Sequence, residues 1–146
     1  MPAISQNPFG EVRIDLREIP KTLRRELRPA LKKTGDQVAQ AARARASWSR
    51  RIPGAIRVKV LYGRARSGVV ITVNRKKAPH ARAYEGIAAR MGNASSFRHP
   101  LFGDREHWYT QRTRPFLHPA AQARRAQVQA DIVKVVADAA RRRGFK

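Results

Sequence analysis

Alternating apolar and polar positions predict strands in the first half of the chain. Residues 11–17 place apolar side chains on one side of a strand and charged side chains on the other. Residues 56–62 alternate in the same way, and an uninterrupted apolar run follows at 69–73 after a turn at 63–68. The last two segments therefore predict a hairpin. Its continuous second arm indicates a central strand, covered on both faces by the helices that the rest of the pattern predicts.

Helical spacing of apolar residues occupies the segment after the first strand and the end of the chain. Between residues 20 and 46, leucine, valine and alanine recur at intervals of three, four and seven, which places them on one helix face. Pro29 lies inside this segment, and proline lacks the amide N–H and crowds the preceding turn. We therefore expect two helices, at about 20–28 and 30–46. A further amphipathic helix is expected from Pro119 to a basic last turn followed by glycine.

The stretch between these patterns has little apolar periodicity. Residues 75–107 are interrupted by glycine and proline, which predicts a long loop or insertion with short strands near 83–85 and 108–113. We expect one α+β domain over residues 1–146. It consists of a small curved antiparallel sheet packed by a long N-terminal helix, which Pro29 can kink, and by a C-terminal helix.

Composition adds a thin core and a large positive charge. Of the 146 residues 42% are hydrophobic, and alanine makes up much of that share. Lys and Arg number 32 against 10 Asp and Glu, a formal net charge of +22, and the largest share of the excess lies on residues 21–66. Nucleic acid, an anionic membrane surface or an acidic protein face are the partners that such a balance indicates. With no signal-like or membrane-spanning apolar run, we expect a soluble protein made in the cytosol, without membrane contact.

Basic residues cluster on the predicted helix and around the predicted hairpin. Such clusters can follow a phosphate backbone without reading sequence, although a charge run is more commonly a solvated face. Aromatic residues are not regularly placed among them, which favours double-stranded over single-stranded nucleic acid. The candidates for contact with a polyanion or a DNA channel are Arg24, Arg25, Arg28, Lys32, Lys33, Arg43, Arg45, Arg50, Arg51, Arg64, Arg66, Arg75, Lys76 and Lys77.

Catalytic signals are weak. The absence of cysteine excludes a disulfide, a thiolate nucleophile and a Cys-ligated zinc site. There is no GxSxG, GxxxxGK[ST] or GxGxxG motif, so we expect no enzyme activity and no cofactor. Asp104 and Glu106 beside His107 suggest a small nuclease as the least favoured hypothesis, because two-metal chemistry needs more carboxylates on rigid elements. The four histidines have no ligand spacing for a metal: His80, His99, His107 and His118.

The most specific local pattern lies at the start of the C-terminal helix. Pro115 keeps the preceding residue extended and ends a strand, and Phe116 and Leu117 are expected to anchor the corner in the core. Pro119 suits the first helical turn. An aromatic-Glu-Gly element precedes this corner at residues 84–86.

In this order of parts the chain resembles the tail-completion, or head-tail joining, neck proteins of long-tailed bacteriophages over residues 11–143. It departs from them in a longer insertion at 87–107 and in Ile87, where the family has a small hydroxyl residue. The matching residues, which are also the interface candidates, are Tyr84, Glu85, Gly86, Pro115, Phe116, Leu117, Pro119 and Ala120.

The resemblance implies a structural virion protein without catalysis. It implies a homo-oligomeric ring, expected to be six-fold, that is assembled in the host cytoplasm. The ring would join the head connector to the tail terminator or tail tube around the channel for genomic DNA, which it would contact without sequence preference. The alternative is a free basic nucleic-acid-binding protein of ribosomal or nucleoid type, whose isolated monomer would bind tightly with a steep salt dependence.

Overall fold

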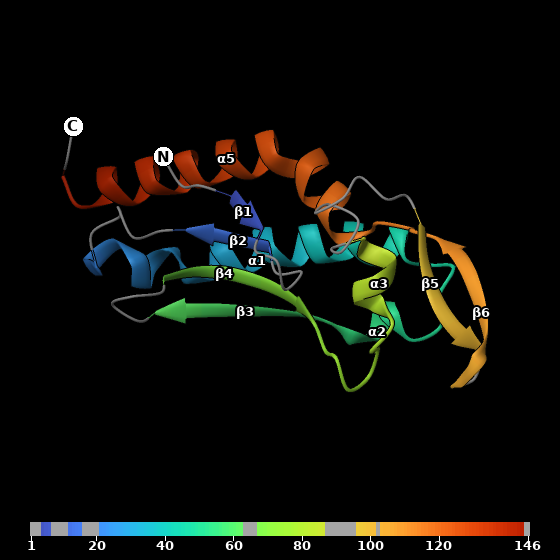
Figure 1. Ribbon diagram of the computed structural model, residues 1–146. Helices are drawn as coiled ribbons and strands as arrows, with labels where there is room; N and C mark the ends of the chain where they lie inside the picture. The colour runs from blue at the N-terminus through green and yellow to red at the C-terminus, as the bar shows by residue number, and fades with distance from the viewer. Residues whose placement is uncertain are drawn as a thin grey trace.

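The computed structural model describes residues 4–6, 12–15, 21–62, 67–86, 96–101 and 103–144 (Figure 1). The expected α+β fold with two long helices and antiparallel sheets is confirmed. The elements in chain order are β1 (Ile4–Gln6), β2 (Val12–Asp15), α1 (Lys21–Arg45), α2 (Ile52–Ala55), β3 (Ile56–Tyr62), β4 (Ser67–Val73), α3 (Ala81–Glu85), β5 (Ser96–Leu101), β6 (Asp104–Arg112) and α5 (Leu117–Arg142).

The larger sheet is antiparallel, with the strand order β1-β2-β4-β3. The β3–β4 hairpin pairs Ile56 with Val73 at one end and Tyr62 with Ser67 at the other, as the alternation predicts. The predicted first strand is β2, and β4 lies between β2 and β3 as a central strand. The three-residue strand β1 is too short to show a period and was not predicted. Most of the predicted turn, at residues 63–66, lies outside the described residues.

Both long helices contribute to a single core on one face of this sheet. Val69 and Ile71 of β4 belong to the core, together with buried residues of α1 and α5. Val70 alternates to the opposite face and is buried as well, whereas Arg57 and Lys59 of β3 are exposed. β4 is thus buried on both faces, as expected of a central strand, but the expectation that the predicted helices cover both faces is wrong for α1 and α5. They pack against each other on the same side of the sheet because their apolar stripes share one core.

Pro29 does not divide the first helix. α1 is continuous from Lys21 to Arg45, so the expectation of two helices is wrong. Pro29 and Arg25, whose carbonyl loses its N–H partner, are both exposed, and water can satisfy that carbonyl. On the buried side, Leu27 and Leu31 hold the helix against the core on either side of the proline.

The expected long loop contains regular structure. Residues 83–85 belong to helix α3 and not to a strand, and α3 ends at Gly86, whose positive φ of 75° suits glycine. The expected strand near 108–113 is confirmed, but β6 begins at Asp104 and pairs with β5. Hydrophobic periodicity missed this hairpin because all residues of β6 are exposed. Residues 87–95 lie outside the described part of the chain.

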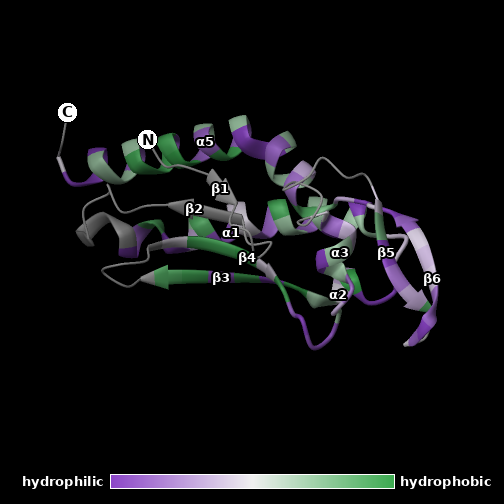
Figure 2. Ribbon diagram, in the orientation of Figure 1, coloured by the Kyte–Doolittle hydropathy of each residue, from purple (hydrophilic) through white to green (hydrophobic). Residues whose placement is uncertain are grey.

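Hydropathy separates the body of the protein from this second hairpin. Figure 2 shows hydrophobic residues along β3, β4 and parts of both long helices, and mostly hydrophilic or neutral residues along β6. Among the residues described, no helix combines the length and apolar character that a membrane span requires.

Candidate functional site

A carboxylate from α3 holds the N-terminus of α5. Oε2 of Glu85 accepts hydrogen bonds from the backbone N–H groups of Phe116 (2.9 Å) and Leu117 (3.0 Å). Oε1 accepts a third from His118 (2.7 Å). Glu85 is 3% exposed, so these bonds lie away from solvent. The helix dipole favours negative charge at this end, and bonds to a carboxylate are charge-assisted.

The same junction explains the second proline of the corner. The first four N–H groups of an α-helix have no partner within the helix. The Glu85 carboxylate accepts from Phe116, Leu117 and His118, and the next residue, Pro119, has no N–H to satisfy. The Glu85 side chain and Pro119 therefore leave no N–H group without a partner among residues 116–119 at the start of α5. The side chain of Phe116, the N-cap residue, makes no capping hydrogen bond of its own.

The two segments that carry the resemblance thus form one contact. Glu85 and Phe116 are 31 positions apart in sequence, and a backbone bond from the Arg114 N–H to the Tyr84 carbonyl (2.8 Å) lies beside them. Phe116 and Leu117 are buried in the core, as expected, and so is Ala120 in the first turns of the helix. Nothing in the sequence pattern alone indicates that the two segments meet. The sequence does contain one signal that a partner is needed. The N-cap residue of the C-terminal helix is Phe116, whose side chain cannot cap it, so the first N–H groups need a hydrogen-bond acceptor from another part of the chain.

Aromatic rings lie beside the partly buried Tyr84 at this junction. The Tyr84 ring lies 4.7 Å from the Trp48 ring and 5.2 Å from the Phe97 ring, measured between centroids. The guanidinium carbon of Arg114 lies 5.3 Å from the Trp48 centroid. These contacts connect the end of α1, the α3 segment and the base of β5.

The β5–β6 hairpin projects from the rest of the protein. Figure 1 shows it at the end of the molecule, away from the larger sheet. Trp108 is 48% exposed and Tyr109 is 49% exposed, and Leu101 near the turn is exposed as well. The guanidinium carbon of Arg98 lies 5.9 Å from the Trp108 ring centroid, and the Trp108 Nε1–H donates to the Arg105 carbonyl (2.7 Å). Large aromatic side chains are therefore held in place on a surface that no other described segment covers.

The candidate nuclease residues lie along the end of this hairpin. Asp104 accepts a hydrogen bond from the Glu106 N–H (2.9 Å), and its other oxygen lies 2.8 Å from Nδ1 of His107. These two interactions, the Glu106 bond first, hold the pKa of Asp104 below its ordinary value of 3.8. All three residues are exposed on one strand. Within the described residues no group of three or more potential ligands is placed to hold a metal ion.

The predicted polyanion residues lie on several elements of the fold: α1, the segment that follows it, and the turn after β4. Arg43 is half-buried and donates to the Ile56 carbonyl (3.2 Å), which ties α1 to β3. The Arg24 side chain and residues 64 and 66 lie outside the described part. The remaining candidates are all exposed: Arg25, Arg28, Lys32, Lys33, Arg45, Arg50, Arg51, Arg75, Lys76 and Lys77.

Three of these cations lie on an ordered turn after β4. Oδ1 of Asn74 accepts from the N–H groups of Lys76 (2.9 Å) and Lys77 (3.3 Å), and the Asn74 N–H donates to the Ala55 carbonyl (2.9 Å). The asparagine thereby fixes the turn and its adjacent basic residues.

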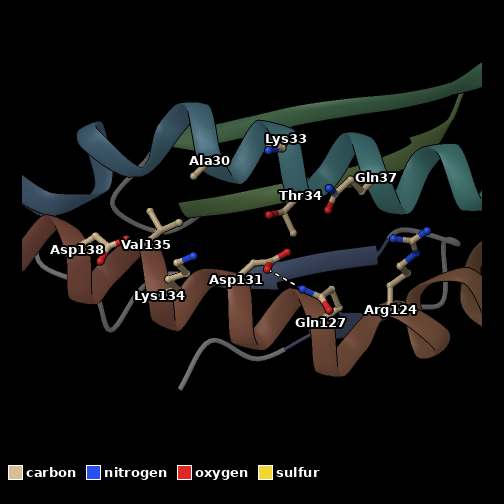
Figure 3. A pocket seen from close by; sticks show the side chains of 10 residues that line it. All are labelled: Ala30, Lys33, Thr34, Gln37, Arg124, Gln127, Asp131, Lys134, Val135 and Asp138. Carbon is tan, nitrogen blue, oxygen red and sulfur yellow. Dashed lines mark hydrogen bonds between the residues drawn. The ribbon is translucent and has the colours of Figure 1, made fainter.

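A groove of about 470 Å³ lies between α1 and α5 (Figure 3). Its charged lining residues are three cations, Lys33, Arg124 and Lys134, and two carboxylates, Asp131 and Asp138, and the buried Thr34 also lines it. Both signs of charge are thus present, and no pattern in the sequence indicates this groove.

Comparison with known proteins gives no match. No family model, curated protein or solved structure matches the chain. The residues of the chain are therefore the basis on which a function is proposed.

Proposed function

We propose that the chain is a structural virion protein of the phage neck, which forms a ring joining the head connector to the tail terminator or tube. The observation that carries this proposal is the hydrogen bonding of Glu85 to the start of α5. It joins the two short segments on which the resemblance depends, although they are far apart in sequence. A buried contact between the two segments supports the interpretation that they belong to one structural element, as the resemblance implies.

The distribution of charge supports the same proposal. Most predicted basic candidates are exposed, and the chain has too few acidic residues to balance them. In a ring around a channel, such surfaces can contact the phosphates of passing DNA without sequence preference. They can also dock on acidic rims of neighbouring rings.

Examination of virions tests this function. The gene product should be detected by mass spectrometry in purified particles of the phage that encodes it. Cryo-electron microscopy of those particles should place the chain as a ring between connector and tail. Its absence from particles that contain the other neck proteins would overturn the proposal.

A free nucleic-acid-binding protein is the second candidate, and the exposed basic turn that Asn74 orders favours it. This candidate predicts tight binding by a monomer, with log affinity falling against log salt by about 0.9 per phosphate neutralised. A protein that stays monomeric, binds duplex DNA tightly and is missing from virions would favour it over the neck protein.

A further inference from the structure

We infer that the β5–β6 hairpin (Ser96–Leu101 and Asp104–Arg112) is an arm that docks on a second copy of this chain. The inference rests on the proposed function, because it names the contact that would build the ring. The physical starting point is that a two-stranded hairpin is marginally stable on its own in water. Phe97 packs this hairpin against Tyr84 at its base, but the hairpin projects from the body with Trp108 and Tyr109 exposed, so a partner surface would stabilise it.

The exposed side chains are those that contribute most to protein interfaces. Trp, Tyr and Arg dominate the binding energy of such interfaces. The hairpin presents Trp108 and Tyr109, and Arg98 lies against the Trp108 ring. Among the described residues, three of the five large exposed hydrophobic side chains lie on this hairpin, including Leu101 near the turn. A cluster of this kind indicates an interaction site rather than a solvated loop.

One strand of the hairpin also offers open backbone groups. β6 pairs with β5 on one side only within the described sheet, and it contains no proline. β5 carries Pro100, which reduces the capacity of that strand for further pairing. β6 has nine residues, which corresponds to about 30 Å of extended chain. It is therefore long enough to reach a neighbouring molecule and pair with it.

The charge at the turn end of the hairpin favours a second copy over nucleic acid as the occupant. Asp104 and Glu106 alternate with Arg105 along β6, so the two carboxylates share one face of the strand, whereas Arg98 and Arg112 lie nearer the base of the hairpin. At the turn end these carboxylates would repel a phosphate backbone. They are complementary to the exposed basic surfaces that every other copy offers, such as Arg57 and Lys59 on the open face of β3. A projecting arm on one side and a receiving surface elsewhere is the arrangement from which head-to-tail rings are built.

Assembly of purified variants tests the inference. The wild type is compared with Trp108→Ala/Tyr109→Ala and with Asp104→Asn/Glu106→Gln, which removes the charge but retains the shape of the hairpin end. Val133→Ala is the matched control, because Val133 is an exposed hydrophobic residue on α5. Mass is measured by light scattering over a range of protein concentrations, and thermal unfolding checks that each variant is folded.

The wild type and Val133→Ala should form the same ring. The two hairpin variants should require a protein concentration on the order of tenfold higher or more to assemble. Rings that form equally well in all four proteins would overturn the docking role and leave the neck function standing. A wild type that stays monomeric would overturn both. Normal rings with loss of duplex-DNA binding in the aromatic variant would assign the hairpin to nucleic acid instead.

Discussion

A buried carboxylate is costly unless hydrogen bonds satisfy it, and Glu85 meets this condition with three backbone N–H groups. The same bonds satisfy a helix end that has no capping side chain of its own. At the scale of single residues, the corner depends on Glu85 more than on the prolines that make it recognisable in the sequence.

Removal of this carboxylate should destabilise the fold. Glu85→Ala leaves three N–H groups of α5 without an acceptor, and we expect a loss of about 2–4 kcal/mol in the free energy of unfolding. Denaturant titration followed by circular dichroism measures the loss. Glu106→Ala removes an exposed glutamate and should change stability by no more than about 0.5 kcal/mol. Equal stability of the two variants would contradict the capping role.

A close approach between α1 and the sheet requires the glycine at position 35. A Cβ placed there would lie 2.5 Å from Cγ1 of Val69 and 2.9 Å from Cγ1 of Val58. Gly35→Ala should therefore lower stability by about 1–2 kcal/mol, since overpacking outweighs the helix propensity of alanine. The control is Gly54→Ala, where a Cβ meets nothing within 4 Å. It should be neutral or stabilising, and a stabilising effect of Gly35→Ala would refute this packing.

At the scale of elements, the two long helices and the sheet hold one another in place. α1 remains straight enough to be one helix despite Pro29, because buried leucines on either side of it contact the core. Near the opposite end of the chain, the Arg143 guanidinium pairs with Glu26 of α1, with Nε at 3.0 Å from the carboxylate.

Pro29→Ala should stabilise the protein. The exchange restores a backbone hydrogen bond inside α1 at an exposed position, which is worth about 1–3 kcal/mol in a helix interior. The midpoint of urea denaturation should rise accordingly. A lower midpoint would show that the proline contributes to the fold in a way that the continuous helix does not explain.

The ion pair between Glu26 and Arg143 should make the free energy of unfolding depend on pH. The hydrogen bond from Arg143 lowers the pKa of Glu26 below its ordinary value of 4.5. The stability that the pair contributes is therefore fully present at a pH above 4.5, the ordinary pKa. It is lost as the pH falls through the lower pKa that Glu26 has in the folded state. Wild type should unfold at a higher urea concentration than Glu26→Gln at pH 7, and the difference should vanish in strong acid. A difference that does not change with pH would contradict this linkage.

At the scale of the whole molecule, sequence patterns predicted the hairpin β3–β4, the strand β2 and both long helices, because buried faces leave a period. They missed the β5–β6 hairpin, whose exposed residues leave none, and they divided α1 at a proline that tertiary packing accommodates. The candidate site was found in parts. Glu85 and Phe116 were each singled out, but the hydrogen bond between them is a tertiary contact across 31 positions that no local period reports.

If the chain is a neck protein, copies of it should assemble into a ring. Native mass spectrometry of the purified full-length wild type, with negative-stain electron microscopy of the same sample, tests it most directly. We expect one closed oligomer of defined copy number, six, seen as a ring with a central channel. A monomer at every concentration, or an open-ended aggregate without a fixed mass, would contradict it.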